Sequence, residues 1–238
     1  MPGWTSGRTT DLVTRGGWIT RVVKPALYAA GVAPLAWIGF ALATDRVDGD
    51  QVKFIQHVTG TTVLVSLFVT LSVTPLRRLT GVNQLIRVRR LIGLTGFWYA
   101  VLHFLSYLVF DQALSPADIA EDVAEHPWVL VGFTSFLLLI PLAVTSTAGW
   151  VRRLGGKRWQ RLHRLVYPAA IGGVLHYLWL VKKDLRDPVY FAVALALILV
   201  ARVWVSRGGR RSAPRKHEEA IRMPSPSSTF ATQGEDLL

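Results

Sequence analysis

Apolar residues in this chain form six long blocks rather than an alternating pattern. A helix that crosses the hydrocarbon core of a bilayer needs about 20 mostly apolar residues, and each block approaches that length. The blocks lie at residues 25–44, 54–74, 91–110, 128–148, 162–181 and 188–205. The second is the weakest candidate because it is rich in Thr and Ser. The pattern predicts an all-α fold, an integral membrane bundle of six transmembrane helices.

Basic residues are concentrated in every second connecting segment. The basic segments are the N-terminal one, the second loop, the fourth loop and the C-terminal tail; they contain Arg8, Arg15, Arg21 and Lys24, then Arg77, Arg78, Arg87, Arg89 and Arg90, then Arg152, Arg153, Lys157, Arg158, Arg161 and Arg164, and finally Arg207, Arg210, Arg211, Arg215, Lys216 and Arg222. Cytoplasmic loops of membrane proteins carry such an excess of Lys and Arg. Both termini are therefore expected in the cytoplasm. The acidic third loop, with Asp111, Asp118, Glu121, Asp122 and Glu125, is expected on the outer face.

The same pattern divides the chain into three parts. Residues 1–22 form a cytoplasmic N-terminal segment, and residues 23–205 form the six-helix transmembrane domain. Residues 206–238 are polar, contain Gly, Pro and Ser, and have too few apolar side chains to fold, so we expect a disordered cytoplasmic tail. The first apolar block is too long for a cleavable signal peptide and lacks a cleavage site.

The amino-acid composition excludes several kinds of functional site. Hydrophobic residues make up 51% of the 238 residues and the mean hydropathy is +0.34, which few soluble domains reach. The chain has no cysteine, which excludes disulfides, iron–sulfur clusters, thiol catalysis and covalently attached haem. The net charge of +12 could indicate nucleic-acid binding. The basic residues flank apolar blocks instead of forming one soluble patch, so we expect no nucleic-acid partner and contact with membrane lipid.

Two histidines inside the apolar blocks are the strongest functional candidates, because an ionisable side chain is costly in hydrocarbon. His103 lies about 18 Å from the cytoplasmic end of its helix, and His176 falls at a similar depth on another helix. Imidazole is a common axial ligand of haem iron. We interpret His103 and His176 as the axial pair of one haem b.

Small residues accompany both histidines. Gly96 and Ala100 precede His103 at helical spacing, and Gly172 and Gly173 lie one turn before His176. Such residues leave room for a flat macrocycle, and we expect them to pack against the haem. The alternative is that they only let two helices approach closely.

Four further histidines lie elsewhere in the chain. His163 lies about 20 Å nearer the cytoplasm than His176. It could bind a second haem, alone or with a partner other than histidine, or it could contact a propionate or a quinone. His57 begins the second block and is either an interfacial polar residue or part of an outer quinone or haem-edge site. His126 and His217 are expected to be solvated and inert.

Several segments resemble the MsrQ (YedZ) family of ferric-reductase-like membrane proteins. The similar blocks run from Arg89 to Leu94 and from Leu102 to Tyr107, from Gly156 to Tyr167 and from His176 to Trp179, together with residues 56–60 and 71–77. The resemblance covers about residues 20–205. It identifies His103, His163 and His176 with the haem histidines of the family.

The resemblance implies an electron-transfer subunit of the bacterial inner membrane. Members pass electrons to a periplasmic molybdopterin subunit, MsrP, which reduces methionine sulfoxide in oxidised envelope proteins. The family is described as carrying haem b and FMN, with the quinone pool or a cytosolic flavin reductase as electron donor. FMN rests on the resemblance alone. Two rival interpretations remain: a quinol-linked b-type cytochrome with another acceptor, and a transporter with intramembrane histidines. We see no internal repeat of the kind common in transporters.

Overall fold

The computed structural model describes residues 19–181 and 184–211, and no strand occurs in these ranges. Its long helices are α2 (Lys24–Ala43), α3 (Gln51–Thr80), α4 (Ile86–Ser106), α6 (Pro127–Val144), α9 (Val166–Leu180) and α10 (Arg186–Arg211). A π-helical turn, Ile19–Val23, precedes α2, and another, Tyr107–Asp111, extends α4. Short 3-10 turns, Asn83–Leu85 and His163–Leu165, precede α4 and α9. The all-α membrane fold is confirmed.

Five of these helices are long and apolar enough to cross a membrane, and each overlaps a predicted block. The fifth predicted block differs. There the chain forms α8 (Gly156–Leu162), the 3-10 turn and then α9, which has only 15 residues. At 1.5 Å per residue α9 is about 22 Å long, shorter than the roughly 30 Å hydrocarbon core. The count of six spans therefore stays a prediction.

The loops contain helices that the apolar pattern did not predict. α5 (Pro116–Glu125) occupies the acidic third loop, and α7 (Ala148–Leu154) and α8 occupy the basic fourth loop. α10 also continues to Arg211, past the boundary expected at residue 205. The rest of the predicted tail and residues 1–18 lie outside the described residues.

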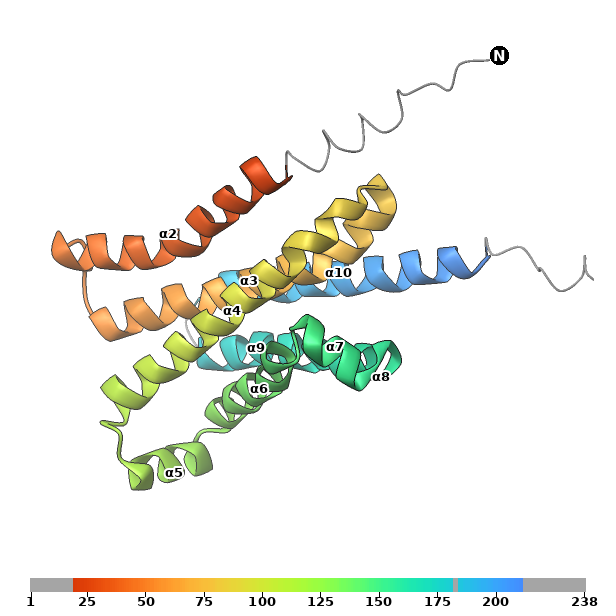
Figure 1. The fold of residues 1–238 in the computed structure, drawn as a ribbon. Helices are drawn as coiled ribbons and strands as arrows, with labels where there is room; N and C mark the ends of the chain where they lie inside the picture. The colour runs from red at the N-terminus through yellow and green to blue at the C-terminus, as the bar shows by residue number, and fades with distance from the viewer. Residues whose placement is uncertain (1–18, 182–183, 212–238) are drawn as a thin grey trace, which may run out of the picture.

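The helices place the acidic and basic segments at opposite ends of the bundle. The start of α2, the α3–α4 connection, α7 with α8, and the end of α10 lie at one end (Figure 1). The α2–α3 connection and α5 lie at the other. This arrangement agrees with the predicted separation of charge. The cytoplasmic position of both termini stays a prediction.

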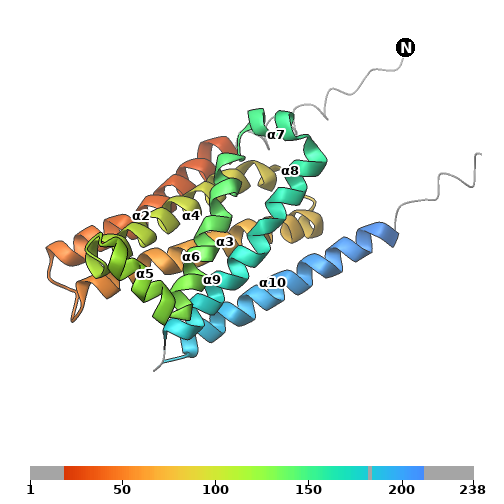
Figure 2. The ribbon, with the colours of Figure 1, turned by 90° about the horizontal axis from the view of Figure 1, so that it is seen from below.

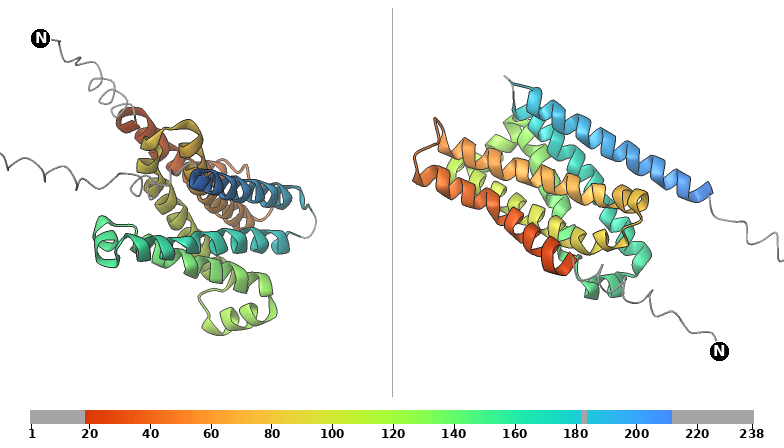
Figure 3. Two further views of the ribbon diagram at one scale, coloured as in Figure 1. Left: turned by 90° about the vertical axis from the view of Figure 1, so that its right-hand side faces the viewer. Right: turned by 90° about the horizontal axis from the view of Figure 1, so that it is seen from above.

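α3, the predicted span that is rich in Thr and Ser, is the central helix. Figure 2 shows α2 and α10 at opposite margins, with α3 between them, and Figure 3 shows α10 alongside α3. Three of its hydroxyl groups have partners within the helix: Thr59, Thr61 and Thr62 each donate to a main-chain carbonyl of the preceding turn. In a bilayer such internal partners are required. The Thr and Ser residues that weakened the prediction thus mark an interior helix.

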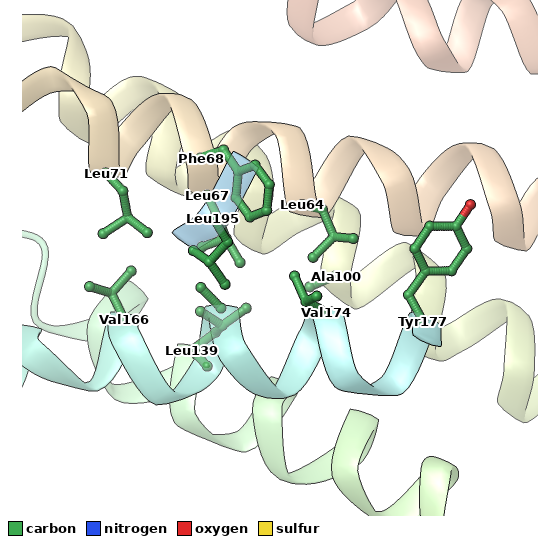
Figure 4. Packing of buried hydrophobic residues seen from close by; sticks show 12 residues of the cluster. Leu64, Leu67, Phe68, Leu71, Ala100, Leu139, Val166, Val174, Tyr177 and Leu195 are labelled. Atoms are coloured by element: carbon green, nitrogen blue, oxygen red, sulfur yellow. The ribbon is translucent and has the colours of Figure 1, made fainter. Parts of the chain in front are cut away.

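The apolar core lies where α3 faces α9. Four side chains of α3 contribute to it: Leu64, Leu67, Phe68 and Leu71 (Figure 4). The side chains from α9 are Val166, Ala169, Ala170, Val174 and Tyr177, and α4, α6 and α10 add Ala100, Leu139 and Leu195. The outer helix faces expose large apolar side chains, including Trp98, Leu197 and Trp204. Such a surface suits lipid rather than water.

One polar contact ties α10 to this core. Pro75 has no N–H, so the carbonyl of Leu71, four residues earlier, loses its helical donor. The Arg202 guanidinium donates to that carbonyl at 2.5 Å, and its Nε donates to the Tyr167 hydroxyl at 3.0 Å. A charged side chain of α10 therefore satisfies a carbonyl that the proline frees in α3.

We expect Arg202→Leu to lower the stability of the detergent-solubilised protein by about 1–3 kcal/mol, because the Leu71 carbonyl would be left without a donor. Arg207→Leu is the matched control, since Arg207 is exposed on the same helix. Thermal unfolding followed by circular dichroism measures both variants. Equal effects of the two substitutions would contradict the role assigned to Arg202.

Candidate functional site

The structure brings His103 of α4 and His176 of α9 together. Their ring centroids are 6.3 Å apart, and the ring planes are nearly perpendicular, at 82°. No other pair of histidine rings is found in contact within the described residues. The two histidines predicted at matched depth are therefore neighbours in the fold.

Both imidazoles use the same ring nitrogen, Nδ1, for a hydrogen bond to the main chain. His103 Nδ1 lies 3.1 Å from the Gln56 carbonyl oxygen, and His176 Nδ1 lies 2.7 Å from the Trp128 carbonyl oxygen. A carbonyl only accepts, so Nδ1 carries the proton in each ring. The other nitrogen, Nε2, then has a free lone pair, and no hydrogen bond to either Nε2 occurs in the part of the chain that the structure describes. Metal-binding histidines characteristically have their second nitrogen fixed in this way.

The separation of the rings fits a shared iron atom. An iron bonded at about 2.0 Å to Nε2 of two imidazoles holds their ring centres roughly 6 Å apart, and the centroids lie 6.3 Å apart here. Within the described residues no group of three or more His, Cys, Asp or Glu side chains could hold a bare metal ion. A two-histidine site suits a metal whose other positions are filled by a macrocycle. The donor set thus fits haem.

His163 has the same Nδ1 contact, but no second histidine ring lies against it in the part of the chain that the structure describes. Its Nδ1 lies 3.2 Å from the Trp159 carbonyl oxygen, and its ring stacks on the Trp159 indole at 3.8 Å. Its Nε2 is buried and has no hydrogen-bond partner. Leaving a buried polar atom unpaired costs about 1–3 kcal/mol, so such an atom indicates a ligand contact. Arg89 is close enough to interact with this imidazole electrostatically.

His57 is exposed on α3, and its ring centroid lies 6.1 Å from that of Tyr177, the residue after His176. The structure thus places His57 beside the candidate site but not in contact with either imidazole of the pair. Its predicted role at a quinone or haem-edge site stays open.

His126, which we expected to be solvated and inert, keeps 37% of its side chain exposed but is bonded to its neighbours. Its Nδ1 lies 2.8 Å from an Asp122 carboxylate oxygen, and its ring packs on Trp128 with centroids 4.5 Å apart. The Tyr107 hydroxyl donates to the other Asp122 oxygen at 2.6 Å. α5 is thereby fixed to the end of α4 and to the residue whose carbonyl holds His176. The four-residue spacing of Asp122 and His126 is visible in the sequence, whereas the bond from Tyr107 needs α5 to fold back.

The small residues predicted to pack against haem contact helices in the structure. A Cβ added to Gly96 would lie 2.8 Å from Ser66 Cβ, and one added to Gly173 would lie 3.1 Å from Leu64. Gly172 approaches Ser135 even more closely, and Ala100 is part of the buried core. What the structure shows for all four is close helix packing, the alternative considered above.

Two other glycines lie against the histidine rings. Gly60 of α3 contacts His103, and Gly132 of α6 contacts His176. The main-chain carbonyls of Gln56 and Trp128 were also missed, since a carbonyl has no signature in sequence. Gly60 lies in the segment 56–60 that contributed to the family resemblance, whereas nothing in the sequence distinguishes Gly132.

Known proteins are similar to this chain in sequence. Residues 57–174 match the family of ferric reductase like transmembrane components, a range that includes His57, His103 and His163. Three similar proteins are each named protein-methionine-sulfoxide reductase heme-binding subunit MsrQ. The protein from Ralstonia nicotianae is 47% identical over 196 residues, which cover 81% of this chain and 90% of the relative. That from Xanthomonas campestris pv. campestris is 45% identical over 198 residues, with 81% and 90% covered, and that from Herminiimonas arsenicoxydans is 45% identical over 185 residues, with 77% and 85% covered.

The similarity extends through the residues of the candidate site and over most of each relative. It agrees with the multi-pass helical fold and with an imidazole pair that suits a haem. The chain therefore belongs to the MsrQ family of haem-binding subunits of protein-methionine-sulfoxide reductase.

Proposed function

We propose that this protein is a haem b electron-transfer subunit of the bacterial inner membrane. It would take electrons from the quinone pool or a cytosolic flavin reductase and deliver them to a periplasmic molybdopterin subunit similar to MsrP, which reduces methionine sulfoxide in envelope proteins. The observation that supports this most directly is the contact between His103 and His176, each with Nδ1 bonded to a carbonyl.

The protein's own part in this function would be to hold the haem and to insulate it from water. His103 and His176 would supply the two axial nitrogens of a haem, whose iron accepts and releases one electron at a time. The carbonyls of Gln56 and Trp128 fix the orientation of the rings and raise their basicity. The surrounding helices exclude water.

A second haem contact at His163 would extend the path toward the arginine-rich end of the bundle. By residue count at helical rise, His163 lies about 20 Å nearer the arginine-rich end than His176. Its buried, unpartnered Nε2 supports a ligand at this position. Electrons entering from the cytoplasmic side would then reach the outer site through two steps. FMN remains an expectation from the family, because none of the contacts described above is specific for a flavin.

Absorption spectra of the purified protein test the proposal. We expect a low-spin haem b spectrum that changes on dithionite reduction, and reoxidation of the reduced protein when MsrP is added. A colourless preparation from haem-replete cells would contradict haem binding. Reduced haem that quinone reoxidises but MsrP does not would favour the quinol-linked cytochrome with another acceptor.

The acidic outer face of α5 offers a docking surface for the partner. Asp118, Glu121 and Glu125 are exposed, whereas Asp122 is occupied by His126 and Tyr107. We expect the triple variant with Asn or Gln at the three exposed positions to slow electron delivery to MsrP at low salt and to have less effect as screening grows. Charges at the rim of an interface act mainly on the association rate.

Stopped-flow reoxidation across a salt series measures this effect. The control variant carries Asp45→Asn and Asp48→Asn, which remove exposed charge from the α2–α3 connection at the same end of the bundle. Rates that do not change with the α5 substitutions at any salt concentration would show that the loop is acidic only because outer loops lack Lys and Arg.

A further inference from the structure

Each imidazole of the pair lies against one turn of a neighbouring helix, and the two turns have the same construction. His176 bonds to the carbonyl of Trp128 and lies against Gly132, four residues later in α6. His103 bonds to the carbonyl of Gln56 and lies against Gly60, four residues later in α3. A carbonyl followed at the fourth position by glycine thus occurs twice, on two different helices.

The spacing has a geometric reason. In an α-helix the carbonyl of one residue accepts from the N–H of the residue four positions later, so both groups lie side by side on one face. A ring that shares this carbonyl must lie directly over the later residue. There a Cβ on Gly132 would be 2.7 Å from His176 Nδ1 and 2.9 Å from Cε1, distances that real side chains do not tolerate. Only glycine leaves room for the hydrogen bond.

The turn of α3 that lies against His103 has the same construction, but it leaves more room for the ring. A Cβ on Gly60 would lie 3.1 Å from His103 Cε1 and 3.3 Å from Nδ1. The neighbouring Thr59 hydroxyl lies 3.2 Å from the same nitrogen, so this ring has a second polar contact. A methyl group at Gly60 would therefore displace the imidazole by a few tenths of an ångström without expelling it.

We propose that Gly60 and Gly132 are positioning residues for the haem, each completing a carbonyl-and-glycine seat that fixes the rotation of one axial imidazole. This inference rests on the proposed haem ligation by His103 and His176. The seats hold the ring planes at 82° to each other. Perpendicular imidazoles leave the two iron d orbitals that interact with them nearly equal in energy. Ferric haem in such a site gives a highly anisotropic low-spin electron paramagnetic resonance signal, unlike the rhombic signal of parallel rings.

The experiment compares Gly132→Ala, Gly60→Ala and a control, Gly93→Ala. Gly93 lies on the same helix as His103, and a Cβ there meets only Thr70, at the ordinary contact distance of 3.8 Å. We expect Gly132→Ala to weaken haem binding about tenfold, since overpacking of a filled site is strongly destabilising. Gly60→Ala should keep its haem with a shifted resonance signal and midpoint potential. Gly93→Ala should match the wild type in all three measurements.

A double variant separates the ring clash from general damage to α6. Gly132→Ala should lower the thermal stability of the haem-free protein, but should have no such effect when His176 is already alanine, because no ring is left to clash. A penalty that persists without the imidazole would overturn the assignment.

The remaining outcomes are equally distinct. Three results would overturn the assignment of the seats while leaving haem binding intact. The first is wild-type haem affinity and a wild-type resonance signal in both Gly60→Ala and Gly132→Ala, and the second is a loss of haem affinity in Gly93→Ala equal to theirs. The third is a rhombic resonance signal from the wild-type protein. A wild-type protein without haem would instead contradict the proposed function itself.

Discussion

His103→Ala and His176→Ala are each expected to remove nearly all of the low-spin haem from the purified protein. Each substitution deletes one of two axial nitrogens, and the site offers no replacement: Thr59 is the only other side chain that hydrogen-bonds to either imidazole within the described residues, and its hydroxyl already donates to the Ile55 carbonyl. Six-coordinate low-spin iron requires both axial bonds. A pyridine haemochrome assay, normalised to protein, measures the loss.

His57→Ala is the matched control, because this imidazole lies on the same side of the bundle but faces Tyr177 rather than either histidine of the pair. It should keep its haem. Circular dichroism must show that all three variants remain helical. If both His103→Ala and His176→Ala kept a full low-spin spectrum, the axial pair would be a different one.

Residue counting was sufficient to predict that His103 and His176 are neighbours, and for a simple reason. Depth in a membrane helix follows from residue counting at 1.5 Å per residue, so two histidines at matched depth on different spans can be recognised without coordinates. Rotation about the helix axis cannot be obtained in this way. The small residues near His103 and His176 in sequence were therefore assigned to the haem, whereas Gly96 and Gly172 pack against Ser66 and Ser135.

The glycines that contact the imidazoles lie on the partner helices, α3 and α6. Which helix a given ring faces depends on packing, and a single sequence carries no direct record of it. The same limit applies to Asp122, whose bond from the Tyr107 hydroxyl forms only when α5 folds against the end of α4. Apolar blocks predicted the spans because lipid imposes their length, but α5, α7 and α8 are too short or too polar to be recognised by that criterion.

The interruption before α9 also has a local cause. His163–Leu165 forms a 3-10 turn, and Pro168 follows in the first turn of α9, where its missing N–H has no helical partner to lose. The turn breaks the predicted fifth block and rotates His163 relative to His176. Counting along one continuous helix would leave the two imidazoles on different faces without saying what His163 meets. In the structure the His163 ring stacks on Trp159, and its Nε2 is buried without a hydrogen-bond partner.

His163→Ala is therefore expected to reduce haem per protein by about half and to leave the low-spin spectrum of the His103–His176 site unchanged. All three histidines hold Nδ1 near a carbonyl, which leaves Nε2 available as a ligand. Within the described residues no other histidine ring contacts His163, the chain has no cysteine, and its two methionines lie outside the described residues.

A haem at His163 would thus have a single imidazole ligand, and its signal should be high-spin in the ferric state. The decisive measurement combines haem stoichiometry with low-temperature electron paramagnetic resonance: the high-spin component should disappear in His163→Ala and persist in His57→Ala. Unchanged stoichiometry with slower reduction by the electron donor would place a quinone or propionate contact at His163 instead. Loss of the low-spin signal as well would mean that His163 serves the main haem, and the two-site arrangement would have to be abandoned.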